Sequence, residues 1–128
     1  MSIRTPLARA RGLGSAGSGV EHWWRQRLSA AALVPLTLWF VASLVAHVGA
    51  DYDSVIAWLT APVSAILMIL YVAALYYHSQ LGLQVIIEDY IHTDWIKIAA
   101  IVALQFVNIL LAVAAIFSII VIVLGAGG

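Results

Sequence analysis

Residues 98–124 read IAAIVALQFVNILLAVAAIFSIIVIVL, a run that contains no Asp, Glu, Lys or Arg. The hydrocarbon core of a bilayer is about 30 Å thick, and a helix rises about 1.5 Å per residue, so about 20 apolar residues are enough to cross it. Two further runs without charged side chains reach this length, at about residues 28–48 and 58–87. The sequence therefore predicts an all-α membrane protein with three transmembrane helices.

The composition agrees with this fold class. Of the 128 residues, 64% are hydrophobic and only 9% are charged, whereas a soluble domain carries roughly a quarter charged residues. A membrane β-barrel would need short alternating strands, and these runs are continuous and far too long. The formal net charge of zero offers no basic surface to a nucleic acid, so a nucleic-acid partner is not expected.

The chain contains no cysteine. Disulfides, a thiolate metal site and an iron–sulfur cluster held by this chain are therefore excluded. Any redox chemistry must use histidine, carboxylate, tyrosine or tryptophan side chains, or a cofactor.

The charged residues predict the orientation in the membrane. Five of the six basic residues precede the first span, at Arg4, Arg9, Arg11, Arg25 and Arg27. Because basic residues are enriched on the cytoplasmic side, the N-terminus is predicted to be cytoplasmic. The loop with Asp51 and Asp53 then falls outside, the loop from Glu88 to Lys97 inside, and the C-terminus outside. We expect a multi-pass protein of a bacterial cytoplasmic (inner) membrane.

Residues 1–27 are predicted to form a cytoplasmic leader, and residues 28–128 the three-helix anchor. Ser18 and Glu21 have the spacing of a capping box, which predicts a short interfacial helix that carries Trp23 and Trp24 to the membrane surface. The glycines of residues 12–17 fit a dinucleotide-binding pattern, but no βαβ unit surrounds them, so we interpret this stretch as a linker.

Histidines within the spans are the main functional candidates, because ionisable groups in a bilayer are costly. His78 is predicted near the midplane, whereas His47 is predicted at the outer interface, about 13 Å away in depth. The simplest role for His78 is a hydrogen bond to Gln105 or Asn108 on the third span. Gly82, one turn further on the same face, instead leaves room for a flat macrocycle.

Two residues at the inner end of the second span extend this pattern. Asp89 follows His78 by eleven residues, which returns it to nearly the same helix face, about 16 Å closer to the cytoplasm. Tyr90 adds a phenol donor beside that carboxylate. Loop solvation and an aromatic belt are the alternative interpretation of this pair.

The spacing His78-x3-Gly82-x6-Asp89-Tyr90 resembles the second-helix signature of the small membrane anchor of succinate dehydrogenase (respiratory complex II). Residues 19–30, GVEHWWRQRLSA, are similar to that family's lead into its first span. The order of these motifs, the length and the three spans cover nearly the whole chain.

The resemblance implies an electron-transport function linked to the tricarboxylic acid cycle. It implies that His78 is an axial ligand to the iron of haem b and that Tyr90 hydrogen-bonds ubiquinone, with Asp89 near that site. Arg27 would lie near the haem propionates. Glu21 departs from relatives that carry histidine at this place, and His22 follows it.

The resemblance also implies partners: a second membrane anchor of the cytochrome b type, an iron–sulfur subunit and a flavoprotein. Haem b with two histidine ligands needs both at one depth, and His47 and His78 differ in predicted depth. Under the haem interpretation the second ligand therefore comes from the other anchor, and the cofactor is shared. This chain alone is not expected to be catalytic.

Two other functions stay open from the sequence. One is the anchor of a quinol:fumarate reductase, which has a similar architecture and the opposite physiological direction. The other is a non-redox helical subunit of a transporter or an assembly factor, with polar side chains that join its helices.

Overall fold

The computed structural model describes residues 15–125, which form four helices and, within that range, no strand. The helices are α2 (Ser15–Ala46), α3 (Tyr52–Thr60), α4 (Pro62–Tyr90) and α5 (Asp94–Val123). Three stretches are long and apolar enough to cross a membrane: Gly19–Ala46, Pro62–Tyr90 and Asp94–Val123. The predicted all-α fold with three spans is thus confirmed.

Helix α2 is longer than the predicted first span. The short interfacial helix and the span at 28–48 form one continuous helix, which also passes through Pro35. Ser18 therefore lies inside the helix rather than at its start. No proline separates residues 15–27 from the span, so nothing in the backbone forces a break there. Residues 1–14, with most of the predicted leader, lie outside the described residues.

A short helix, α3, follows the first span where the sequence predicted a loop. The side chain of Asp51 caps it by accepting a hydrogen bond of 2.9 Å from the backbone N–H of Ser54. The second span then begins at Pro62 rather than near Trp58. Ala61 is extended because it precedes a proline, and Pro62 occupies the first turn of α4, where its missing N–H costs nothing.

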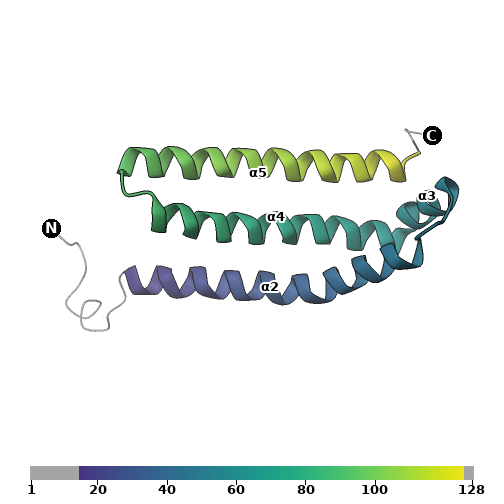
Figure 1. The fold of residues 1–128 in the computed structure, drawn as a ribbon, viewed down its shortest axis with the longest axis horizontal. Coiled ribbons are helices and arrows are strands. Elements are labelled where there is room, and N and C mark those ends of the chain that lie inside the picture. Colours follow the sequence, from purple (N-terminus) through teal and green to yellow (C-terminus); the bar gives the residue numbers. More distant parts are fainter. Residues whose placement is uncertain (1–14, 126–128) are drawn as a thin grey trace.

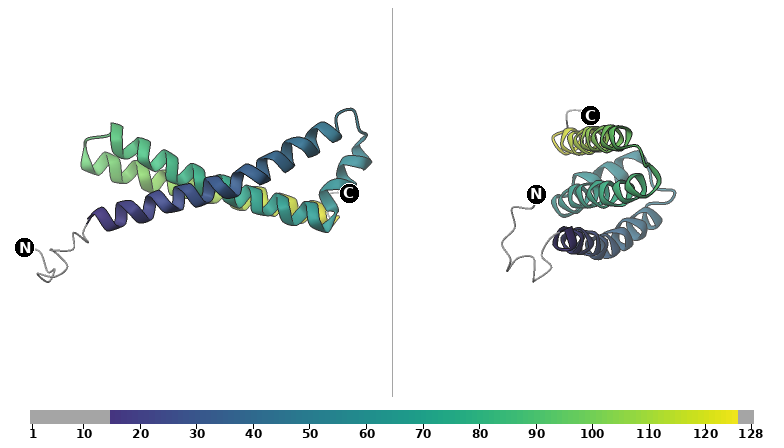
Figure 2. Two further views of the ribbon diagram at one scale, coloured as in Figure 1. Left: turned by 90° about the horizontal axis from the view of Figure 1, so that it is seen from below. Right: turned by 90° about the vertical axis from the view of Figure 1, so that its left-hand side faces the viewer.

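The three long helices form a stack with α4 in the middle. Helix α2 packs on one side of α4 and α5 on the other, and α2 crosses the other two at an angle (Figures 1 and 2). The start of α2 and the α4–α5 loop lie at one end of the stack, and α3 lies at the other (Figure 1).

A stack buries few side chains. Among the described residues the buried ones are Ala65, Met68, Leu81, Ser29 and Asn108. Many large apolar side chains of the three spans are exposed, as expected where lipid or other subunits surround the helices. The two buried polar residues lie on the two helices that flank α4, and both make contacts to it.

Candidate functional site

His78 lies on α4 and faces α2. Its Nδ1 atom is 2.9 Å from the hydroxyl oxygen of Ser29. Ser29 is only 7% exposed, and its hydroxyl also donates a hydrogen bond of 2.9 Å to the backbone oxygen of Gln26. The sequence offered Gln105 or Asn108 as partners of this histidine; the structure gives it a partner on the opposite neighbouring helix.

The contact with Ser29 also fixes the depth of His78. Ser29 follows the predicted start of the first span by one residue, whereas His78 is predicted near the midplane. Side chains in contact share one level, so the structure places His78 at the level of the charged start of α2, where Arg25 and Arg27 precede Ser29 by four and two residues, rather than at the middle of the first span.

A pocket lies beside α2 and α4, on the side of the Ser29–His78 contact that faces the start of α2 and the end of α4. It has a volume of about 480 Å³ and is lined by Gly19, His22, Trp23, Gln26, Gly82 and Val85. A Cβ atom at Gly82 would lie 3.7 Å from the side-chain nitrogen of Gln26, an ordinary contact. Glycine is therefore not required there by helix packing, and its effect is to keep the pocket wide.

Two polar atoms near this pocket are buried and have no hydrogen-bond partner among the described residues. They are Nε2 of His22 and Oε1 of Gln26. Buried polar groups are normally paired, so this part of α2 is suited to a polar group that the chain itself does not supply.

Arg27 lies on α2, two residues before Ser29. Its guanidinium carbon is 5.1 Å from the centre of the Trp23 ring, close enough for a cation–π contact. The side chain is exposed. Six residues earlier, Glu21 forms an ion pair with Arg25, so this carboxylate is matched by a charge on its own helix.

Asp89 and Tyr90 are the last two residues of α4, and both are exposed. Tyr90 is 79% exposed. They lie about 16 to 18 Å along the helix from His78. Within the described residues no hydrogen bond joins Asp89, Tyr90 or Arg27 to His78, so the structure groups His78 with Ser29 and leaves the other three predicted site residues on the surface.

His47 lies at the opposite end of the stack. Its Nδ1 atom is 2.8 Å from the backbone oxygen of Ser43, and its ring centre is 5.0 Å from that of Trp58. Since Ser29 marks the level of His78 on α2, the two histidines are about 27 Å apart along that helix. This separation is about twice the predicted one and leads to the same conclusion: they cannot share one iron.

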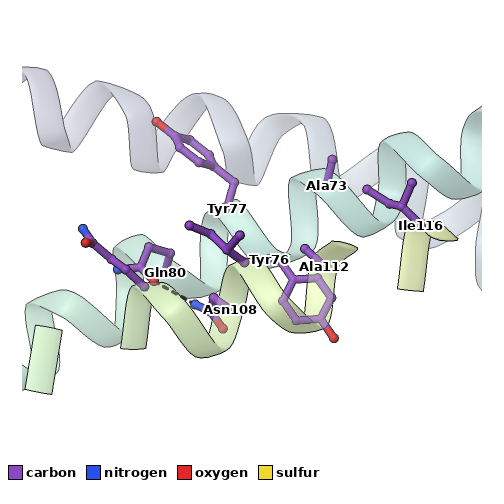
Figure 3. Close-up of a pocket in the computed structure, with 9 residues that line it drawn as sticks. Ala73, Tyr76, Tyr77, Gln80, Asn108, Ala112 and Ile116 are labelled. Atoms are coloured by element: carbon purple, nitrogen blue, oxygen red, sulfur yellow. Dashed lines mark hydrogen bonds between the residues drawn. The ribbon is translucent and has the colours of Figure 1, made fainter. Parts of the chain in front are cut away.

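A second pocket lies between α4 and α5, with a volume of about 560 Å³ (Figure 3). Its lining contains none of the predicted site residues. The side-chain nitrogen of Asn108 donates a hydrogen bond of 2.9 Å to Oε1 of Gln80 there, and Nε2 of Gln80 is buried without a partner among residues 15–125. Gln80 was not singled out from the sequence. The run of three polar residues at 78–80 within an apolar span is the signal that could have pointed to it.

Within residues 15–125 no three His, Cys, Asp or Glu side chains come together as a metal site. A haem iron does not need such a cluster, because the porphyrin supplies four ligands and the protein only the axial ones.

Comparisons with known proteins agree on one family. The family described as succinate dehydrogenase/fumarate reductase transmembrane subunit matches residues 1–112. The succinate dehydrogenase hydrophobic membrane anchor subunit of Rickettsia bellii is 36% identical over 112 residues, which cover 88% of this chain and 90% of that protein. The corresponding protein of Paracoccus denitrificans is 32% identical over 106 residues, covering 83% and 82%. No solved structure matches the chain.

Proposed function

The chain belongs to the succinate dehydrogenase/fumarate reductase transmembrane subunit family, and from this premise we propose that it is the hydrophobic membrane anchor of a succinate:ubiquinone oxidoreductase. The observation that carries this proposal is the similarity to curated succinate dehydrogenase anchors over nearly the full length of both chains. We place it in a bacterial cytoplasmic membrane, with its N-terminus and the α4–α5 loop on the cytoplasmic side.

His78 would hold the iron of haem b as one of two axial ligands. The residues fit this group: Ser29 engages Nδ1 of the imidazole, which leaves Nε2 for ligation, and Gly82 keeps the adjoining pocket wide. The exposed guanidinium of Arg27 lies over the Trp23 ring, and its N–H groups could pair with a propionate carboxylate. When bound, haem b supplies a one-electron redox centre within the membrane.

With His78 as a ligand, a second histidine ligand would come from another chain. The four histidines of this sequence lie at different levels, and only His78 lies at the level of Ser29. His47 is about 27 Å away along α2, and His22 is about 10 Å away. We therefore propose that haem b is shared with a second membrane anchor, and the open stack leaves faces of all three spans available to such a partner.

Tyr90 and Asp89 would form part of the ubiquinone site. Reduction of a quinone to a quinol takes two electrons and two protons, so the site needs a donor to the carbonyl oxygen and a route to water. The exposed phenol of Tyr90 can donate that hydrogen bond, and the carboxylate of Asp89 beside it can take up protons from water and pass them on. Because the chain has no cysteine, the electrons would come from an iron–sulfur protein, which receives them from a flavoprotein that oxidises succinate.

The haem assignment is tested by His78→Ala in the purified complex, with His47→Ala as the matched control. We expect the His78→Ala complex to lose all or most of the haem b absorbance after dithionite reduction, and the control to keep it. An unchanged reduced spectrum in His78→Ala would overturn the ligand assignment. The set of proteins in each preparation, read from a gel, separates loss of the ligand from loss of the complex.

A further inference from the structure

We infer that Ser29 is a positioning residue for His78: it holds the imidazole in the tautomer that carries its proton on Nδ1 and so presents the lone pair of Nε2 to the haem iron. This inference rests on the proposed role of His78 as an axial ligand. Among the serines of the described spans, Ser29 is the buried one.

The tautomer follows from a count of hydrogens. The hydroxyl of Ser29 has one hydrogen, and the backbone oxygen of Gln26, 2.9 Å away, can only accept. With that hydrogen donated to Gln26, Ser29 meets Nδ1 of His78, also 2.9 Å away, through a lone pair. In this arrangement Nδ1 carries the proton. In a neutral imidazole the other nitrogen, Nε2, is the unprotonated one.

The geometry is held firmly. Ser29 is 7% exposed, so water does not readily replace it, and its bond to Gln26 is made within one turn of the same helix. A ring whose Nδ1–H is already bonded loses that bond if it flips or changes tautomer. This is the general arrangement of metal-bound histidines, whose second nitrogen donates to a fixed acceptor.

The acceptor also affects the metal electronically. A hydrogen bond from Nδ1–H makes the imidazole a more basic ligand, and a more basic axial ligand favours ferric over ferrous iron. Removing the acceptor should therefore raise the reduction potential of the haem. If the role of Ser29 were purely structural, its substitution would lower stability without a consistent shift of the reduction potential.

The test compares three variants in the intact, purified complex by redox titration of the haem and by electron paramagnetic resonance of its oxidised form. Ser29→Ala removes the acceptor and should raise the midpoint potential and shift the resonance. Ser29→Thr keeps a hydroxyl and should resemble the wild type. Ser43→Ala is the matched control, because Ser43 also donates to its own helix, at Trp39, and should change neither reading.

An unchanged potential and resonance in Ser29→Ala would overturn the inference while leaving the proposed function intact. Retention of the haem spectrum in His78→Ala would overturn the ligand assignment, and the inference with it. Loss of haem from an assembled Ser29→Ala complex, restored in Ser29→Thr, would support the inference.

A second measurement covers the case in which Ser29→Ala does not assemble. Nitrogen-15 magnetic resonance of labelled histidine in the full-length wild-type chain, placed in lipid without haem, should show His78 protonated at Nδ1, with His78→Ala used to assign the signal. Protonation at Nε2 instead would overturn the inference.

Discussion

At the scale of single residues, His78 could be predicted as a candidate site from the sequence, but its contacts could not. A histidine in an apolar span, with a glycine one turn later, is enough to mark it as a candidate site, and the pocket beside Gly82 agrees with that interpretation. Its partner Ser29 could not be chosen in advance. Which of the polar residues on the other spans meets His78 depends on the crossing of α2 over α4, and this crossing leaves no periodic trace in the sequence.

The roles of Tyr90 and Asp89 stay predictions, because the structure shows only that both are exposed at the end of α4. Tyr90→Phe removes the phenol donor and keeps the ring. We expect ubiquinone reduction to fall about tenfold, the equivalent of one lost hydrogen bond of about 1.4 kcal/mol. Succinate oxidation by an artificial dye, which bypasses the quinone site, should remain near wild type in the same preparation.

Tyr52→Phe is the control for this experiment, since Tyr52 is also exposed but lies on α3 at the other end of the stack. It should leave both activities unchanged. Equal losses of quinone and dye activity in Tyr90→Phe would point to an assembly defect and argue against a quinone contact.

At the scale of elements, the three spans were predictable because each is a long run without charge. Their boundaries were less so. The first span joins residues 15–27 in one helix because no breaker separates them, and the second begins at Pro62 because the residue before a proline is held out of the helical conformation. Helix α3 was missed because the charge of Asp51 indicates a solvated loop as readily as a helix cap.

The capping role of Asp51 predicts a pH dependence for α3. Hydrogen bonds from Ser54, through its hydroxyl and its backbone N–H, hold the pKa of the Asp51 carboxyl below its ordinary value of 3.8. A carboxyl with a lowered pKa stabilises the folded helix above its unfolded pKa, and this stabilisation is lost as the pH falls through the lowered value. Below about pH 4, amide protection in α3 should therefore decrease.

Hydrogen exchange of the α3 amides, corrected for the intrinsic effect of pH, measures this change. Asp51→Asn should show protection that no longer varies with pH in this range, and Asp53→Asn, which alters the first turn but not the cap, should behave like the wild type. A wild-type profile in Asp51→Asn would contradict the capping role.

Helices α4 and α5 are joined by the hydrogen bond between Gln80 and Asn108. Asn108→Ala should destabilise the anchor by about 0.6 to 2 kcal/mol, the range found for such bonds in membranes. Thermal unfolding of the detergent-solubilised complex measures this, with Ser118→Ala as the control, because Ser118 on α5 bonds only within its own helix. If Gln80→Ala and Asn108→Ala had fully additive effects, the pair would not be coupled.

At the scale of the whole molecule, the stack of three helices is an incomplete structure for its proposed task. It supplies one histidine at the level proposed for the haem and no thiolate, and most of its large apolar side chains are exposed. Composition alone could show that the chain belongs in a membrane. The need for a second anchor and an iron–sulfur protein follows from what the haem and quinone chemistry requires and this chain does not contain.

Purification of the affinity-tagged chain from its native membrane tests the central claim most directly, through the reduced-minus-oxidised spectrum and the protein composition of the same preparation. We predict a red preparation with a haem b spectrum, in which this chain is accompanied by a flavoprotein, an iron–sulfur protein and a second membrane anchor. A colourless preparation of this chain alone, or in company with the proteins of a transporter, would contradict the proposed function.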